Sequence, residues 1–149
     1  MERITNQELP KGFFNTLLKT QEYVDASGLD HSLLELVRMR VSLINGCAYC
    51  LDMHYKLGIH LGDSAQRLTS VSVWREAPYY SEKEKAALEF AERLTQVSTD
   101  HDPDTLHDNL SKFFTKEEIA HLTLAIIQIN GWNRITRSFG TVAGTYKVA

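Results

Sequence analysis

The chain has 149 residues, of which 43% are hydrophobic and 23% are charged, and its formal net charge is -3. These proportions are close to the average of globular proteins and exclude an intrinsically disordered chain. The length fits one domain, so we treat residues 1–149 as a single domain. The slightly acidic balance gives no general positive field for phosphate backbones, and we therefore expect no nucleic-acid partner.

The sequence also bears on location and on the redox state of its cysteines. Residues 1–7 lack the apolar core of a secretory signal, and no run approaches the roughly 18–20 apolar residues that cross a bilayer. We therefore expect a cytoplasmic protein without membrane contact. The two cysteines are only three positions apart, so they cannot connect distant parts of the chain as the disulfides of small secreted domains do. In a reducing compartment, such a pair indicates redox chemistry or metal binding.

Helical periodicity runs through the chain, and no segment alternates apolar and polar residues as a half-buried strand would. We therefore predict an all-α fold, a single-domain bundle of about six to seven helices. In chain order, helices are expected over residues 13–26, 30–44, 47–61, 64–68, 81–97 and 103–113, and from 115 onward. Gly131 lies inside the last segment and predicts an interruption there.

Several of these helix starts carry recognisable capping residues. Asp30 can cap the second helix, and the Asn45-Gly46 dipeptide supplies a stop at its other end. Ser81-Glu-Lys-Glu84 and Thr115-Lys-Glu-Glu118 both follow the capping-box pattern, and Pro103 suits the first turn of a helix. The local signals therefore divide the chain at short, well-defined turns.

The segment from Glu35 to His54 carries the residues best suited to chemistry. On a helix that opens near Cys47, the spacing of Cys47, Cys50 and His54 brings two sulfurs and an imidazole onto one face. The positive end of that helix favours a thiolate, and His54 can accept a proton from Cys50. Glu35 lies within the apolar stripe of the preceding helix, and an antiparallel return could bring its carboxylate to the far nitrogen of His54. A sulfenic acid formed at one cysteine would condense with its neighbour to a disulfide.

Other interpretations of these residues remain open. The cysteines could be small buried residues at a helix start, or half of a zinc site completed by His54 and Glu35. A structural zinc site usually draws on a second ligand cluster, and the sequence has none, so we expect no metal. The remaining histidines show no metal-ligand spacing and are expected at the surface or as caps: His31, His60, His101, His107 and His121. Helix packing or an interface is expected, ahead of a substrate pocket, for Trp132, Phe139 and Tyr146.

The pattern E-x11-C-x-x-C-x3-H, from Glu35 to His54, resembles the alkylhydroperoxidase D (AhpD)-like branch of the carboxymuconolactone decarboxylase-like family. The order of the helices and residues 129–135 also resemble small single-domain members. The resemblance implies an all-helical fold, usually a trimer or a hexamer, and a thiol-dependent peroxidase without a bound cofactor. It assigns peroxide attack to Cys50, resolution to Cys47 and proton relay to Glu35 and His54. The oxidising substrate would be a small hydroperoxide, and the reductant a dihydrolipoyl group or another dithiol, free or carried by a protein.

One position departs from the family's fullest pattern. Tyr49 stands where the best-described relay has a second histidine, and tyrosine rarely shuttles protons near pH 7. The departure implies a shorter relay, or one completed by water, and weaker activity toward peroxides. Two alternatives are a redox-sensitive scaffold without catalysis and an enzyme acting on a small carboxylated ring. The decarboxylase branch generally lacks the cysteine pair, so Cys47 and Cys50 argue against the second alternative.

Overall fold

The computed structural model describes residues 1–149 as seven α-helices joined by short connections, with no strand. The all-α prediction is therefore confirmed. In chain order, the helices are α1 (Phe13–Asp25), α2 (His31–Ile44), α3 (Ala48–His60), α4 (Ala65–Ser70), α5 (Glu82–Thr95), α6 (Pro103–Leu110) and α7 (Lys116–Phe139). Short 3-10 turns occupy Asn6–Glu8, Val71–Val73 and Val97–Thr99.

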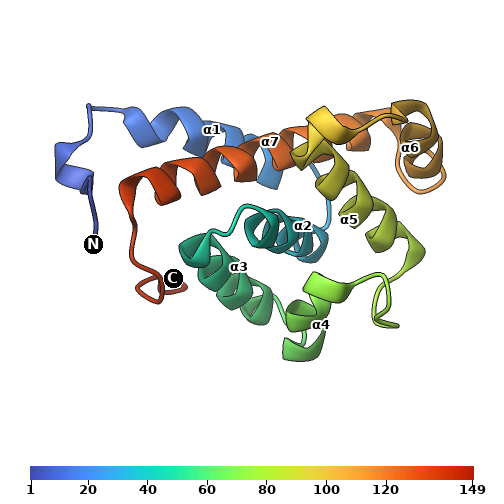
Figure 1. Cartoon of the computed structure of the whole chain (residues 1–149), viewed down its shortest axis with the longest axis horizontal. Coiled ribbons are helices and arrows are strands. Elements are labelled where there is room, and N and C mark those ends of the chain that lie inside the picture. Colours follow the sequence, from blue (N-terminus) through green and yellow to red (C-terminus); the bar gives the residue numbers. More distant parts are fainter.

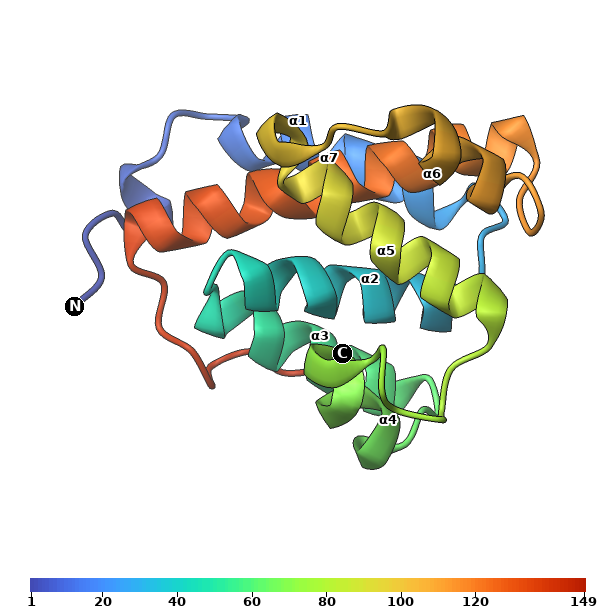
Figure 2. The same cartoon turned by 45° about the vertical axis from the view of Figure 1, so that its right-hand side comes forward.

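Helix α2 lies at the centre of the bundle, between α7 on one side and α3 on the other (Figures 1 and 2). Helix α1 runs beside α7, and α5 packs against both α2 and α7. Opposite faces of α2 enter two separate apolar clusters, with Leu34 and Val37 in one and Leu36 and Met39 in the other. Each fully buried leucine contributes about 1.5–3 kcal/mol relative to an exposed one. Because α2 is covered on both faces, polar side chains along it must find partners inside the protein.

The helix starts follow the capping signals of the sequence. The Asp30 carboxylate accepts the backbone N–H groups of Ser32 and Leu33, and complete capping boxes are present at Ser81 and Thr115. Helix α3 was expected to include Cys47, but Cys47 is the capping residue and the helix begins one residue later. Gly46, with φ of +63°, makes the tight turn between α2 and α3 in a conformation that favours glycine. That turn sets the position of Cys47.

The predicted interruption at Gly131 is wrong, because α7 is continuous from Lys116 to Phe139. The reason is the packing of α1 on α7. A Cβ atom at Gly131 would lie 3.2 Å from Cδ2 of Leu17, so the glycine lets α1 approach closely, and this contact outweighs the roughly 1 kcal/mol cost of glycine in a helix. Neither α7 nor any other helix is long and apolar enough to cross a membrane.

Candidate active site

The two cysteines form a disulfide at the start of α3, with their Cα atoms 5.4 Å apart. Cys47 caps the helix, and its Sγ accepts the backbone N–H of Cys50 at 3.3 Å. Both side chains are buried. The pair therefore lies at the positive end of the α3 dipole, which favours a thiolate once the disulfide is reduced.

Glu35 and His54 meet beneath this pair. The Nδ1 atom of His54 lies 2.6 Å from Oε2 of Glu35, and both side chains are buried. The contact expected from the sequence is thus present. When Nδ1–H donates to the carboxylate, the neutral imidazole keeps its lone pair on Nε2, so Glu35 fixes both the tautomer and the orientation of the ring.

Two nitrogens of this network are buried without a hydrogen-bond partner, Nε of Arg38 and Nε2 of His54, and only the histidine nitrogen can accept a proton. Nε2 is buried and has no hydrogen-bond partner in the chain, a state that costs about 1–3 kcal/mol for a buried polar group. His54 follows Cys50 by four residues on α3, and helical side chains lean toward the N-terminal turn. The imidazole therefore leans toward the turn that carries Cys50, with an acceptor available for a thiol proton.

Arg38 and Asp25 extend the network on the other side of Glu35. Arg38 Nη1 donates to Oε1 of Glu35 at 2.8 Å, and its Nη2 donates to Oδ1 of Asp25 at 2.7 Å. Burial alone would raise the pKa of Glu35, but the hydrogen bonds of its carboxylate with His54 and Arg38, together with the charge of Arg38, hold that pKa below its ordinary value of 4.5. The sequence analysis did not identify Arg38, although an arginine three residues after Glu35, within the same apolar stripe, indicates a charge that would need a partner; in the structure Arg38 is buried.

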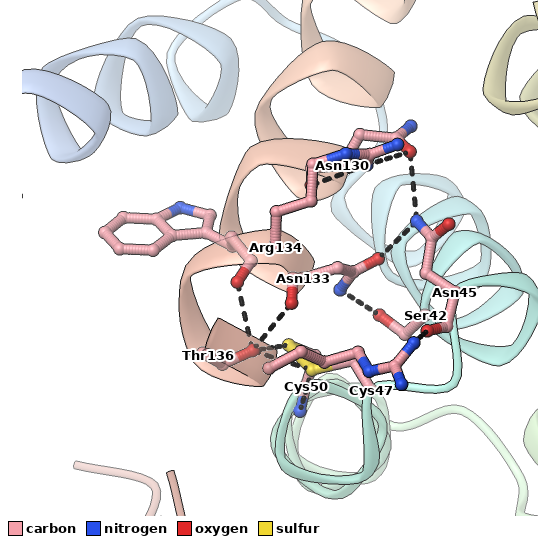
Figure 3. Close-up of a disulfide and its surroundings, with 10 residues drawn as sticks. Ser42, Asn45, Cys47, Cys50, Asn130, Asn133, Arg134 and Thr136 are labelled. Atoms are coloured by element: carbon pink, nitrogen blue, oxygen red, sulfur yellow. Dashed lines mark hydrogen bonds between the residues drawn. A yellow bond between two sulfur atoms is a disulfide. The ribbon is translucent and has the colours of Figure 1, made fainter. Parts of the chain in front are cut away.

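Thr136 of α7 completes the surroundings of the two sulfurs (Figure 3). Its Oγ1 lies 2.8 Å from Sγ of Cys47 and 3.1 Å from Sγ of Cys50. The same hydroxyl is 3.0 Å and 3.2 Å from the carbonyl oxygens of Trp132 and Asn133. Because the hydroxyl has a single hydrogen, it can donate to a carbonyl beside the disulfide and turn to a thiolate, a stronger acceptor, after reduction.

An amide network holds α7 in register with the turn before α3 (Figure 3). The Nδ2 atom of Asn45 donates to the side-chain oxygens of Asn130 and Asn133, each at 3.0 Å. Nδ2 of the fully buried Asn133 donates in turn to Oγ of Ser42 at 3.1 Å. The sequence signal for this network was a pair of asparagines three residues apart, directly after the mostly apolar residues 124–129 of α7. These bonds fix the position of Thr136 beside the disulfide.

Tyr49, the residue in the place of a second histidine, lies in the wall of a pocket and not in the Glu35–His54 pair. The pocket has a volume of about 200 Å³ and is also lined by Cys47 and Thr136, whereas Cys50 is not among its lining residues. Burial is the main cause that raises the pKa of Tyr49, with smaller contributions from Tyr146 and Asp52. In the disulfide form, the sulfur that an incoming molecule meets in this pocket is therefore that of Cys47.

The remaining residues singled out in the sequence lie elsewhere. Four of the other histidines are exposed, and His121 is half-buried with Nε2 3.4 Å from the Tyr23 hydroxyl. The Trp132 ring packs on the Phe14 ring, with ring centroids 5.7 Å apart, so Trp132 takes part in helix packing. No group of three or more His, Cys, Asp or Glu side chains is arranged to hold a metal ion.

Comparison with known proteins gives both a family and relatives. The profile of the Carboxymuconolactone decarboxylase family matches residues 11–93. An uncharacterized protein, YdfG of Bacillus subtilis (strain 168), is 33% identical over 144 residues, covering 97% of this chain and 98% of its own. A solved structure of a protein of unknown function from Agrobacterium tumefaciens, provisionally named the antioxidant defence protein AhpD, is 38% identical with a TM-score of 0.92. The match covers 98% of this chain and all of that chain.

A more distant structure shares the fold alone. The debrominase Bmp8 in its apo form has a TM-score of 0.78 and is 17% identical, over 88% of this chain and 70% of that chain. Debromination differs from antioxidant defence, so the helical scaffold by itself does not decide the reaction. The reaction of this chain is therefore decided by the residues of its own site.

Proposed function

This chain belongs to the carboxymuconolactone decarboxylase family, and from that premise and its cysteine pair we propose a thiol-dependent peroxidase and disulfide reductase in antioxidant defence. The observation that carries the proposal is the buried Glu35–His54 hydrogen bond, which leaves Nε2 of His54 unpartnered one helical turn from Cys50. This arrangement suits a base that takes a thiol proton. The similarity to the Agrobacterium protein named for antioxidant defence supports the same direction.

The oxidative half of the proposed reaction begins with reduced cysteines. His54 takes the Cys50 proton, and the thiolate attacks one oxygen of a hydroperoxide. The O–O bond breaks, Cys50 becomes a sulfenic acid, and the departing alkoxide takes up the proton to leave as an alcohol. Cys47 then attacks the sulfenic sulfur, releasing water and forming the disulfide. Thr136, within hydrogen-bond distance of both sulfurs, donates to the thiolate in each step.

The reductive half returns the pair to its starting state. A dithiol such as a dihydrolipoyl group transfers two electrons to the disulfide and leaves as its own disulfide. No bound cofactor is needed for either half. A homo-oligomer, trimer or hexamer, acting in the cytoplasm is part of the same proposal, and the reductant is either free or carried by a protein.

The test is a thiol titration with one equivalent of an organic hydroperoxide, with mass spectrometry to locate the product. Wild-type protein should lose two thiols and gain a Cys47–Cys50 disulfide. Cys50→Ser should consume no peroxide, whereas Cys47→Ser should consume about one equivalent and stop at a sulfenic acid, because no resolving thiol remains. Peroxide consumption by Cys50→Ser at the wild-type rate would overturn the assignment. An activity on a carboxylated ring that survives loss of both thiols would favour the decarboxylase alternative.

A further inference from the structure

The arginines of this chain fall into two groups, those that pair with a carboxylate and those that do not. Of its eight arginines, five form ion pairs with carboxylates: Arg38, Arg40, Arg67, Arg75 and Arg93. The other three have no carboxylate within 4.0 Å, and all three line the pockets beside the disulfide: Arg3, Arg134 and Arg137. In a protein with a net charge of -3, the unneutralised guanidinium groups are thus gathered at one place.

Neutral acceptors hold these three guanidinium groups in position. Arg137 Nη1 donates to the carbonyl oxygen of Asn45 at 2.7 Å, and Arg3 Nε donates to that of Ser138 at 2.9 Å. Arg134 Nη1 donates to the main-chain and side-chain oxygens of Asn130, both at 2.9 Å. Residues 119–149 contain no Asp or Glu that could neutralise them. Each guanidinium keeps N–H groups free and its full charge, so the cluster is oriented toward an anion that the chain does not supply.

Two pockets meet at Arg137. The larger has a volume of about 450 Å³ and is lined only by polar residues, Asn45, Asn133, Arg134, Arg137 and Ser138. The smaller is the pocket of about 200 Å³ whose wall contains Cys47, and it is also lined by Arg3 and Arg137. A volume of several hundred cubic ångströms suits a small molecule, and an all-polar lining suits its charged end. A molecule anchored by Arg137 therefore has a sulfur of the redox pair within the adjoining space.

We propose that these pockets bind the reductant of the disulfide, and that this reductant is a small dithiol carrying a carboxylate. The inference rests on the proposed function, because it assigns the second substrate of the same site. A planar guanidinium matches a carboxylate in a bidentate manner, and the attacking species in thiol–disulfide exchange is itself an anion, the thiolate. The arginine cluster therefore both anchors the carboxylate and raises the local concentration of the nucleophile.

The proposed exchange begins at Cys47, the sulfur that lines the pocket. One thiolate of the dithiol attacks Sγ of Cys47, the S–S bond breaks, and Cys50 leaves as a thiolate that takes up a proton through His54. The second thiolate then attacks the reductant's own sulfur in the mixed disulfide. This step releases a cyclic disulfide and the Cys47 thiolate, which is protonated in turn. Two electrons and two protons pass from the dithiol to the pair, so the exchange is balanced.

Dihydrolipoate and dihydrolipoamide form a matched pair of probes, because they differ only in a carboxylate against a neutral amide. Oxidised protein is mixed with each at equal concentration without peroxide, and the appearance of protein thiols is followed by alkylation and mass spectrometry. Wild-type protein should react about tenfold faster with dihydrolipoate at low ionic strength, and the preference should shrink in high salt. Arg137→Gln should abolish the preference, and Arg134→Gln should reduce it. Lys112→Gln removes the same charge from an exposed residue in the turn after α6 that lines neither pocket, and it should leave the preference intact.

Equal rates for the two dithiols with wild-type protein would overturn the proposal, as would an unchanged preference in both arginine variants. If Arg137→Gln fails to fold because Asn45 loses its partner, Arg134→Gln decides the question. The outcome is separable from the peroxidase proposal, since no peroxide is present in the assay. A dihydrolipoate preference in a protein that consumes no peroxide supports the anion site and refutes the peroxidase. Peroxide consumption without any preference refutes the anion site alone.

Discussion

Two buried glutamates, Glu35 on α2 and Glu92 on α5, have much in common. Each is less than 10% exposed, and in each case hydrogen bonds and opposite charges outweigh burial and hold the pKa below 4.5. Oε1 of Glu92 accepts from Arg40 Nε and Trp74 Nε1, both at 2.7 Å, and its Oε2 pairs with Arg75 at 2.6 Å. By burial and charge alone, neither carboxylate stands out as the functional one.

The two networks differ in the kind of group at which they end. Every partner of Glu92 is a permanent donor, and its network ends at Arg75, which is 56% exposed and lies over the Trp74 ring. The Glu35 network instead includes His54, the side chain type best able to exchange a proton near neutral pH, and ends at an unpartnered Nε2. A buried carboxylate whose hydrogen-bonding partners are all permanent donors therefore stabilises the fold. A buried carboxylate that positions an imidazole with an unpartnered nitrogen belongs to a functional site.

Neutralising each carboxylate in turn should separate the two networks most clearly. Glu35→Gln should lower peroxide turnover about a hundredfold, because the amide no longer fixes the His54 tautomer or stabilises its charged form. Glu92→Gln should leave turnover per folded molecule within about twofold and instead destabilise the protein by about 1–3 kcal/mol. Dithiol-supported peroxide consumption, normalised to the folded fraction from circular dichroism, measures the first effect, and urea unfolding measures the second. Equal losses of turnover in both variants would remove the distinction.

The parts of the fold that sequence predicts well are those decided within a few residues. Asp30, Ser81 and Thr115 start helices because their side chains bond N–H groups two or three residues away. The interruption expected at Gly131 was wrong because the deciding contact, with Leu17, comes from another helix. The low helix propensity of glycine favoured a break in α7, but the packing of α1 on α7 keeps the helix continuous.

The residues of the site also divide into those placed by local sequence spacing, which could be predicted, and those placed by contacts between distant helices, which could not. The spacing of Cys47, Cys50 and His54 on one helix, and a tight turn back to Glu35, were enough to predict a shared location. Thr136 lies 86 positions from Cys50, and no local rule gives the register of α7 on the start of α3. That register depends on buried amides, which sequence alone does not pair with their partners. Likewise, the sequence does not show which arginines lack a carboxylate partner, because this depends on contacts that exist only in the folded chain.

Thr136 offers a smaller test of the same distinction. Thr136→Val removes the hydroxyl near both sulfurs, and we expect the pKa of the Cys50 thiol to rise and its reaction with peroxide to slow about tenfold. Thr123→Val is the matched control, because its hydroxyl donates to the carbonyl of Ile119 within α7 and does not contact the cysteines. The rate of alkylation of the reduced protein as a function of pH reports the thiol directly. An unchanged alkylation profile in Thr136→Val, with the fold intact, would exclude the hydroxyl from thiolate stabilisation.

The smallest expected effect is on the pH dependence of the unfolding free energy, in which Glu35 and Glu92 should behave alike. A carboxyl group whose pKa is lowered on folding stabilises the protein above its unfolded pKa, and this stabilisation is lost as the pH falls through the folded pKa. For both Glu35 and Glu92, the loss should therefore begin near pH 4.5 and continue below it. Each substitution by glutamine should reduce the slope of unfolding free energy against pH in that window, by at most about 1.4 kcal/mol per pH unit.

Urea unfolding of the oxidised proteins between neutral pH and pH 3 measures these slopes. Asp100 and Asp102 also have a lowered pKa and should leave part of the acid dependence in both variants. If only Glu92→Gln flattened the curve, Glu35 would not be the ionised partner of His54 and Arg38, and the orientation of the imidazole would need another cause. If both flatten it while only Glu35→Gln loses turnover, the two carboxylates share their electrostatics and differ only in the unpaired nitrogen that one of them positions.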